Sequence, residues 1–312
     1  MTNRWHATWD ENWNRAVANE NFRKAFYHGV EWYQWLELMN FINPMSCDFN
    51  TYTLPGIAKF SDGTDYVDRV EELLGVVNNG ETPGKYNAEA AAEYKAKAIE
   101  ELTAQGVTFP IEMVYHVSGS NQTEQDQGVV VKQMIEEGLG TDFVTVEIDT
   151  YVTSLVSEIL PNKLHCIRIV GLSAKLGDST GLLVGEDPRD PNAIFQDTSY
   201  AQVVIDSTDD YRAELVAQLN EFADRLEAAE AIVDDMDARL EASAQAESYY
   251  LEHALCMPLY RKVSWQLTKI NDWSKSPTLY GSVWSIWKDV ETNSDMYTSA
   301  EWAELKAAKE AN

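Results

Sequence analysis

Basic residues are scarce in this sequence. Its 312 residues include 24 Lys and Arg against 51 Asp and Glu, so the formal net charge is −27 with neutral histidines. A negative field of this size repels phosphate backbones and anionic lipid. The composition therefore argues against nucleic-acid binding and against attachment to membranes through a basic patch.

Long apolar stretches are also missing. The longest run without Asp, Glu, Lys or Arg covers residues 276–287 and contains a proline, whereas a membrane-spanning helix needs about twenty largely apolar residues. The first residues, from Met1 to Trp5, show no apolar core of an export signal. We therefore expect neither a membrane-spanning helix nor a signal peptide in this chain.

Cysteine is rare, and tryptophan is absent from the middle of the chain. Cys47, Cys166 and Cys256 are far apart and odd in number, which argues against a disulfide framework and favours buried free thiols. No tryptophan lies between Leu36 and Ser264, although both ends of the chain contain several. We therefore expect the two ends to differ in environment from the centre.

What the centre contains is a regular alternation of strands and helices. Apolar or alternating segments predict the strands, and amphipathic segments predict the helices between them. Strand, helix, strand, helix, strand is the order of a crossover-connected, mainly parallel sheet, so we expect an α/β lobe. The predicted strands are residues 111–117, 143–149 and 164–170, and the predicted helices are 87–105, 123–137 and 154–160.

Residues typical of helix ends support the two longer helices of this region. Asn87 is a favourable N-cap, and Gly106 follows the expected end of the same helix. Thr123, followed three residues later by Asp126, predicts the start of the second helix, and Gly138 is expected to end it.

Helical patterns also flank the centre. An irregular loop broken by prolines and a Ser-Asp-Gly turn is expected over 40–65, and a loop region over 171–208. Further helices are predicted over 10–38 and 66–74, around Leu215 to Leu226, from Asp235 to Leu255, and after Thr298, with a strand over 257–267.

No motif for catalysis, metal binding or nucleotide binding is present. The glycines of 171–181 fit neither phosphate-binding glycine pattern, and no nucleophile elbow occurs. The acidic run 234–237 lacks the glycine and final glutamate of a calcium loop. The histidines show no metal-ligand spacing, although a site shared by His116 and His165 stays open. We predict no catalytic residue, metal or cofactor.

The loop that begins at Gly171 can still bind a ligand. It leaves the carboxyl end of a predicted parallel strand, which is where open α/β sheets place their ligands. A plain connection between two elements is the alternative that the pattern leaves open.

Several segments together resemble one known family, the oligopeptide-binding proteins, which are the solute receptors of peptide ABC transporters. The segments that carry the resemblance are DDMDAR at 234–239, YYLEHAL at 249–255, MPLY at 257–260, SWQLTKIN at 264–271, NFRKAF at 21–26, KYN at 85–87 with its helix, and WK followed by ETN between 287 and 293. Ala88 stands where the family usually has proline.

The resemblance implies a type II periplasmic-binding-protein-like fold of which this chain is a part. Residues 1–256 resemble the second lobe, and residues 257–312 resemble the hinge strand and the C-terminal return to the first lobe. The first part of the first lobe has no counterpart, so we expect a truncated chain. Its return segment should then expose apolar surface that normally packs on the first lobe.

The family's ligand loop normally reads GWGADYGDP, and here the matching run is GLSAKLGDS at 171–179. Leu172 replaces an aromatic residue, and Lys175 replaces the acidic residue that can hold a peptide's ammonium group. The ligand-binding residues implied by the resemblance are Gly171, Leu172, Ser173, Lys175, Asp178, Tyr260 and Trp265.

The function implied by the resemblance is non-enzymatic capture of a peptide by closure between lobes. The implied partners are a peptide ligand, the membrane permease of an ABC transporter, and a separate chain that could supply the missing lobe; the implied location is extracytoplasmic. A repurposed lobe that acts as an interaction module without transport is the alternative, and an acidic hydrolase is a third possibility with no motif in its favour.

Overall fold

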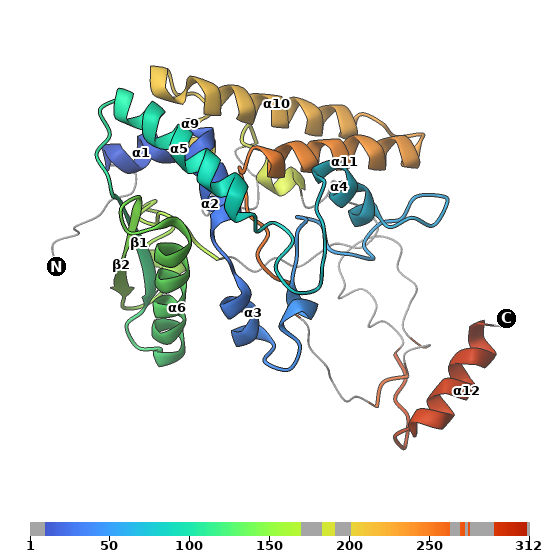
Figure 1. Ribbon diagram of the computed structural model, residues 1–312. Coiled ribbons are helices and arrows are strands. Elements are labelled where there is room, and N and C mark those ends of the chain that lie inside the picture. The colour runs from blue at the N-terminus through green and yellow to red at the C-terminus, as the bar shows by residue number, and fades with distance from the viewer. Residues whose placement is uncertain are drawn as a thin grey trace. The chain divides into compact units, whose positions relative to one another are not determined.

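The computed structural model describes residues 10–169, 183–190, 201–262, 269–271, 274 and 290–310 (Figure 1). Contacts divide the chain into two compact units, the first formed by residues 1–174 and 178–263 and the second by residues 175–177 and 264–312. The predicted assignment of 1–256 and 257–312 to two lobes stays a prediction. No helix among the described residues is long and apolar enough to cross a bilayer.

Three helices occupy the region predicted to be helical over 10–38. They are α1 (Glu11–Ala18), α2 (Glu20–Gly29) and α3 (Tyr33–Met39). The backbone of Asn19 is extended, and its side-chain oxygen accepts from Phe22 N at 2.8 Å, so this residue ends α1 and caps α2. The helical prediction is confirmed, but it did not include this break, because an asparagine within a helical pattern can act as an N-cap.

The next two helices confirm the predictions. Helix α4 (Tyr66–Leu74) has the predicted bounds, and α5 (Ala88–Ala104) begins after Asn87, whose side chain accepts from Ala90 N at 3.1 Å. Gly106 takes a positive φ of 82° directly after α5. The loop 40–65 is irregular apart from a short 3-10 turn, η1 (Pro44–Cys47), and isolated bridges that Lys59 forms with Asp65 and Asp48 forms with Tyr260.

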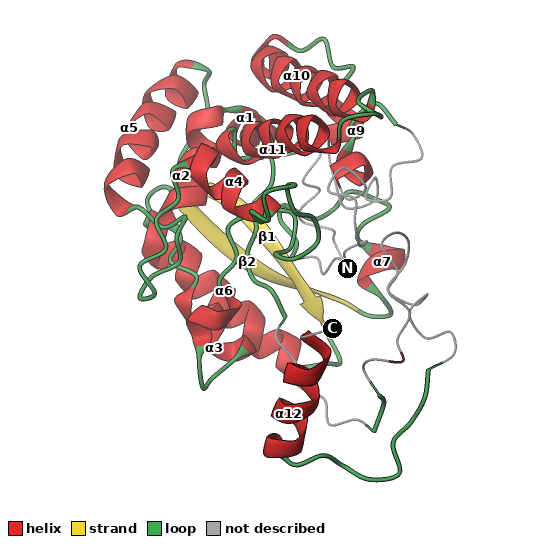
Figure 2. Cartoon of the chain, turned by 90° about the vertical axis from the view of Figure 1, so that its right-hand side faces the viewer, coloured by secondary structure: helices red, strands yellow, loops and turns green. Residues whose placement is uncertain are grey.

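Two parallel strands form the sheet of the first unit. Strand β1 (Ile111–Ser118) pairs with β2 (Val144–Tyr151) in register from Ile111 and Val144 to Ser118 and Tyr151. Helix α6 (Gln122–Leu139) connects them and lies along the sheet (Figure 2). The predicted crossover between parallel strands is therefore confirmed.

Both ends of α6 differ from the prediction. Asn121, not Thr123, caps the helix, because its side-chain oxygen accepts from Thr123 N at 3.1 Å. The helix passes through Gly138, where an added Cβ would overlap the carbonyl oxygen of Gly29. Gly138 thus serves close packing against the end of α2, and the helix ends at Gly140.

The third predicted strand does not form over 164–169, the part of it that the structure describes. These residues nevertheless lie beside β1, since Val114 N donates to Cys166 Sγ at 3.3 Å and Ile167 packs on the same core. The acceptor of this hydrogen bond is a thiol sulfur and not a backbone carbonyl oxygen. Residues 164–169 therefore do not form a β-ladder with β1. The short helix predicted over 154–160 is α7 (Leu155–Glu158), which is capped by Ser154 and precedes this segment.

The rest of the first unit is helical. Helices α10 (Ala213–Glu230) and α11 (Met236–Glu252) are the two long helices predicted, and they lie side by side (Figure 1). Asp235 caps α11 by accepting from Ala238 N at 3.0 Å. Short turns occupy the described parts of the predicted loop 171–208 and the approach to α10: η2 (Val184–Glu186), α9 (Ala201–Val204) and η3 (Asp210–Arg212).

Three clusters of buried side chains stabilise this unit, and the smallest joins α1, α9 and α10. The first joins α1, α2, α3, α5 and α6 to the strands, and the second joins α4 to α10 and α11. Large, fully buried members include Trp32 and Phe143 in the first, and Tyr66 and Phe222 in the second. The cysteines are free, as predicted; Cys47 is buried, and Cys166 and Cys256 are partly buried.

The second unit is described over a shorter length. Ile270 and Thr292 form an isolated antiparallel bridge, and Asn271 N donates to Glu291 O at 2.9 Å. The predicted last helix is α12 (Ser299–Glu310). Thr298 and Glu301 form a reciprocal cap at its start, with Thr298 N donating to Glu301 Oε2 at 2.8 Å.

Candidate functional site

The carboxyl ends of β1 and β2 form a polar edge of the sheet. Open parallel sheets bind ligands at this edge, because the loops that leave the strands diverge there. Ser118 ends β1 and Tyr151 ends β2, and they are partners in the register. The chain then continues into α6 and α7, so two short turns border the edge.

Glu124, in the first turn of α6, holds this edge together. Its Oε2 accepts from Ser118 N at 3.0 Å and from the Tyr151 hydroxyl at 2.7 Å. Gln125 Nε2 donates to Ser118 O and to Gly119 O, both at 3.1 Å. The ends of both strands are therefore fixed to the start of α6, which is what a preorganised binding edge requires.

Arg168 is an incompletely bonded cation beside this edge. Its Nε and Nη1 atoms are buried and have no hydrogen-bond partner. Burial lowers the pKa of Arg168, while nearby Tyr151, Tyr115 and Glu124 oppose this effect. A buried donor without an acceptor is costly, so the guanidinium is suited to receive an oxygen from a ligand.

Two tyrosines border the same guanidinium. Burial raises the pKa of Tyr115 to about 12, and the pKa of Tyr151 is raised for the same reason and by its bond to Glu124. Both hydroxyls therefore stay protonated at neutral pH and can donate a hydrogen bond or accept one. Arg168 and the Tyr115 hydroxyl therefore offer donors to carbonyl or carboxylate oxygens, whereas the Tyr151 hydroxyl, which donates to Glu124, can accept from an N–H group.

Tyr260 is the predicted site residue that the structure describes. It forms an isolated antiparallel bridge with Asp48, and its ring meets the ring of Trp35 edge-on, with centroids 6.1 Å apart. It is half-buried and close enough to Tyr115 to affect the pKa of that residue. Tyr260 thus lies beside the tyrosine and arginine group.

The other predicted site residues lie outside the described residues, and they stay predictions: Gly171, Leu172, Ser173, Lys175, Asp178 and Trp265. The strand predicted over 257–267 shows no strand over 257–262 beyond the bridge at Tyr260. Arg261 fixes this segment instead, since its backbone N donates to Cys47 O at 2.9 Å and its Nε to Ser46 O at 3.0 Å.

Sequence reasoning missed Arg168, Tyr115 and Tyr151. Tyr115 and Arg168 fell within predicted strands and were treated as strand residues, and Tyr151 lies just beyond the predicted strand 143–149. The available signal was the charge itself: Arg168 interrupts the otherwise uncharged run from Leu164 to Val170. A cation within an apolar strand next to a sheet's ligand edge is a reason to expect a binding role.

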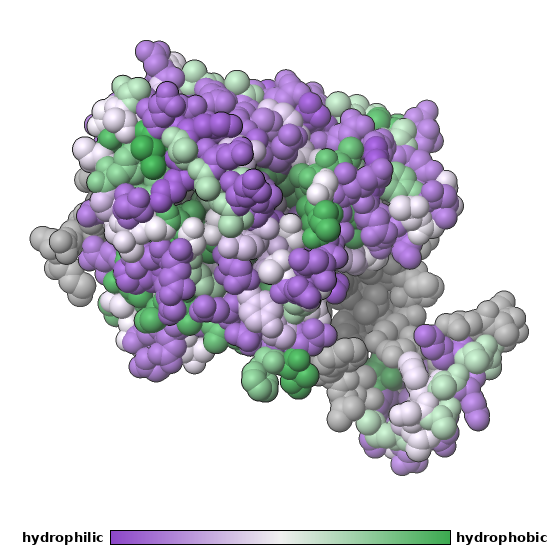
Figure 3. Space-filling model, viewed as in Figure 1, coloured by the Kyte–Doolittle hydropathy of each residue, from purple (hydrophilic) through white to green (hydrophobic). Residues whose placement is uncertain are grey.

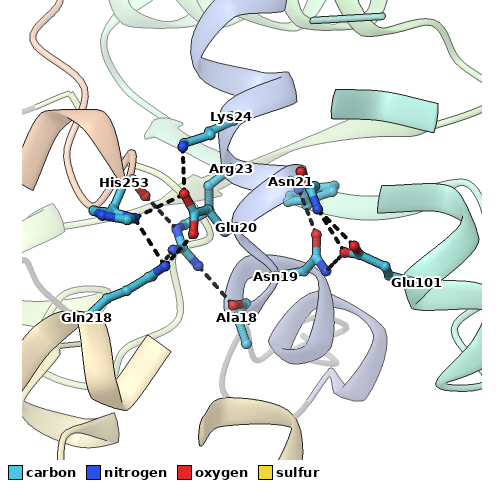
Figure 4. A network of polar contacts seen from close by, with 10 residues as sticks. Ala18, Asn19, Glu20, Asn21, Arg23, Lys24, Glu101, Gln218 and His253 are labelled. Carbon is cyan, nitrogen blue, oxygen red and sulfur yellow. Dashed lines mark hydrogen bonds and ion pairs between the residues drawn. The ribbon is translucent and has the colours of Figure 1, made fainter. Parts of the chain in front are cut away.

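A second polar cluster joins three helices but is closed on itself (Figure 4). Glu20 accepts from Lys24 Nζ at 2.6 Å and contacts His253 Nδ1 at 3.0 Å and Gln218 Nε2. Arg23 donates to Val17 O, Ala18 O, His253 O and Gln218 Oε1. Because these partners satisfy one another, this cluster stabilises the packing of α2, α10 and α11.

The described residues do not offer a metal centre. Among them, no group of three or more His, Cys, Asp or Glu side chains could hold a metal ion. His116 lies 3.9 Å from Asp149, and His165 is buried in the segment beside β1. In the acidic run 234–237, Asp235 caps α11 and Asp237 accepts from Ser61 N at 2.9 Å.

Two curated relatives match this chain, whereas no family model does. The oligopeptide-binding protein AliA of Streptococcus pneumoniae serotype 4 is 25% identical over 259 residues, and the oligopeptide-binding protein SarA of Streptococcus gordonii is 24% identical over 258 residues. Each match covers 78% of this chain and 38% of the relative. The chain thus spans well under half the length of these relatives.

Solved structures share its fold. A peptide-binding protein of a peptide ABC transporter matches with a TM-score of 0.55 and 18% identity, covering 83% of this chain and 96% of that one. Listeria monocytogenes OppA bound to peptide gives 0.55 and 13%, covering 90% and 46%. The pheromone receptor PrgZ gives 0.52 and 15%, covering 93% and 47%.

These matches confirm the resemblance predicted from the sequence. The similarity extends over most of this chain and over part of each longer relative, which fits the expected portion of a larger binding protein. By sequence the chain is similar to oligopeptide-binding proteins, and by fold it is an α/β protein of the type II periplasmic-binding-protein kind.

Proposed function

We propose that this chain is the second-lobe part of an extracytoplasmic oligopeptide-binding component of an ABC transporter. It captures a peptide without chemical change, and a first lobe closes over the ligand. The permease of the transporter then receives the peptide. The similarity to AliA and SarA supports this class of protein.

The observation that carries the proposal is the unsatisfied guanidinium of Arg168. A peptide presents carbonyl oxygens at every residue and a carboxylate at its end, and both are acceptors for a guanidinium. Tyr115 and Tyr151 add hydroxyls that bind backbone groups without reading side chains. A site of this kind tolerates many peptide sequences.

The loop 171–179 contributes to the same function. Lys175 stands where the family has a carboxylate, so it favours ligand carboxylates and disfavours a free ammonium group. As the family resemblance implies, the proposed ligand contacts further include Gly171, Leu172, Ser173, Asp178, Tyr260 and Trp265.

The experiment measures peptide binding by calorimetry, with the chain fused to the first lobe of a full-length relative. We expect Arg168→Gln to weaken binding roughly ten- to a hundredfold, because a hydrogen bond to a charged group contributes about 1.5–3 kcal/mol. Arg225→Gln is the matched control, since Arg225 pairs with Glu221 at 2.8 Å on α10. It should leave affinity unchanged.

Two results would contradict the proposal at different levels. Equal peptide affinity of the Arg168→Gln variant and the parent would show that Arg168 does not bind the peptide. The proposed function, peptide capture, would still stand. No binding of any peptide from a mixed library would favour the interaction module without transport activity.

A further inference from the structure

Glu186 has an enclosed carboxyl group that two tyrosines share. It ends the turn η2 in the described segment 183–190. The Tyr52 hydroxyl donates to Glu186 Oε1 at 3.0 Å, and the Tyr250 hydroxyl lies 3.2 Å from Oε2. Tyr52 comes from the loop before α4 and Tyr250 from α11, so this carboxyl group joins three parts of the first unit.

No cation compensates this carboxylate within the described part of the chain. The titratable groups that face it are Tyr52, Tyr250 and Cys256, and Glu247 lies on the other side of Tyr52. Glu247 is itself fully buried and accepts from Tyr52 N at 2.7 Å. The surroundings are neutral or acidic, and burial raises the pKa of Glu186 to about 7 although both hydroxyls oppose this.

The segment 183–190 has other contacts with the first unit, among them one from Gln202 Nε2 to Asp190 O. Leu183 is fully buried in the cluster formed by α4, α10 and α11. Arg189, on the surface, donates to Asn220 Oδ1 at 2.8 Å and to Asp224 Oδ1 at 2.6 Å. Glu186 lies between an apolar contact and a solvent-exposed ion pair, and it is the member of this set whose charge changes near neutral pH.

We propose that the protonated form of Glu186 holds segment 183–190 on the core of α4, α10 and α11, and that the docking of this segment weakens as the pH rises toward neutrality. The inference is independent of the proposed function. The segment follows the predicted ligand loop 171–179 in the sequence.

The direction follows from the two environments of the carboxyl group. When the segment is detached, Glu186 is in water and titrates near its ordinary value of 4.5, whereas the docked form keeps its proton up to about pH 7. Between these values the detached form loses its proton first. The equilibrium constant for opening therefore rises about tenfold per pH unit from about 4.5 to 7 and is constant above.

The test is amide hydrogen exchange of residues 183–190 in the full chain from pH 5 to 8, corrected for intrinsic exchange rates. In the parent, protection from exchange should fall as the pH rises to about 7 and stay constant above. In Glu186→Gln, protection from exchange should not change with pH. Asp187→Asn is the matched control in the same turn, because Asn keeps the oxygen that accepts from Arg189 N at 2.9 Å. It should behave as the parent does.

A second variant keeps the test decisive if Glu186→Gln does not fold. Tyr52→Phe keeps the ring but removes a hydroxyl that stabilises the anion, so the pH at which protection stops falling should move upward. Protection of the parent that does not vary with pH would overturn the proposal. So would a pH dependence that survives in Glu186→Gln, disappears in Asp187→Asn, or moves downward in Tyr52→Phe.

Discussion

At the scale of single residues, carboxylates of this acidic chain differ because their neighbours differ. Glu20 has Lys24 and His253 beside it, and the hydrogen bond with His253 is the main reason that its pKa falls to about 2. Glu186 has tyrosines in place of cations, and its pKa moves the opposite way. Ionisation of Glu20 therefore favours the folded chain, whereas ionisation of Glu186 disfavours it.

Glu20 should stabilise the protein above about pH 4.5. Because its pKa is lower in the folded chain than in the unfolded one, its contribution disappears as the pH falls from about 4.5 to 2. With allowance for solvent screening, we expect Glu20→Gln to lower the free energy of unfolding by about 1–2 kcal/mol at pH 7.

Urea unfolding at pH 7 and pH 3 measures this effect. The difference between the variant and the parent should shrink at pH 3. Glu11→Gln is the control, because Glu11 pairs with Arg15 at 2.6 Å on an exposed part of α1 and should contribute under about 0.5 kcal/mol. A Glu20→Gln effect that is the same at both pH values would contradict the assignment.

At the scale of elements, close packing of α6 on α2 depends on a glycine. A Cβ at Gly138 would overlap the Gly29 carbonyl oxygen, which is backbone and cannot rotate away. Gly138→Ala gains about 1 kcal/mol of helix propensity but introduces overpacking, which typically costs about 1–3 kcal/mol. We expect net destabilisation.

Thermal and urea unfolding of Gly138→Ala should show that loss. The neighbouring Glu137 is exposed, so Glu137→Ala should change stability by less than about 0.5 kcal/mol. A Gly138→Ala protein as stable as the parent would mean that α6 can move away from α2 without cost.

Elements with clear end signals were predictable. Asn87 and Gly106 fixed the ends of α5 because a cap and a positive φ are local requirements. Asn19, Asn121 and Gly138 misled the prediction, since a sequence pattern does not show which asparagine caps a helix or which glycine serves packing.

The segment 164–169 and its Arg168 were misjudged for a non-local reason. Its pattern is that of a strand, but its actual neighbour, β1, meets it through Cys166 Sγ. The candidate site was therefore predictable as an edge of the sheet, through the order of elements, and not as a set of residues. Tyr260 was identified only through the family resemblance.

At the scale of the whole molecule, exposed apolar side chains occur on both units. The first unit is covered mostly by polar side chains on the face shown, with apolar groups at a few places (Figure 3). Phe41 and Ile42 of the first unit are 88% and 89% exposed, and near or in α12 Met296 is 51% exposed, Tyr297 42% and Trp302 37%.

Removing residues 264–312 should leave the first unit folded. It should also reduce self-association and the binding of a dye that reports apolar surface, because Met296, Tyr297 and Trp302 are removed. Light scattering, dye fluorescence and circular dichroism measure the three quantities. An unfolded 1–263 chain would show that the units are not independent.

A chain that ends at residue 256 is the informative comparison. It additionally loses the Tyr260 and Arg261 contacts with Trp35, Ser46 and Cys47. We expect it to unfold at a lower urea concentration than the 1–263 chain. Equal midpoints would mean that these contacts contribute nothing to stability.

The contacts of Tyr260 and Arg261 also decide how the first unit bears tension. A pull on the chain beyond residue 262 first meets the bonds to Ser46 and Cys47 and the bridge to Asp48, which belong to the region after α3. The force therefore enters the first unit about two hundred residues away in sequence, before it reaches the end of α11. Movement of the segment after residue 262 is therefore transmitted to the loop that follows α3 and not to α11.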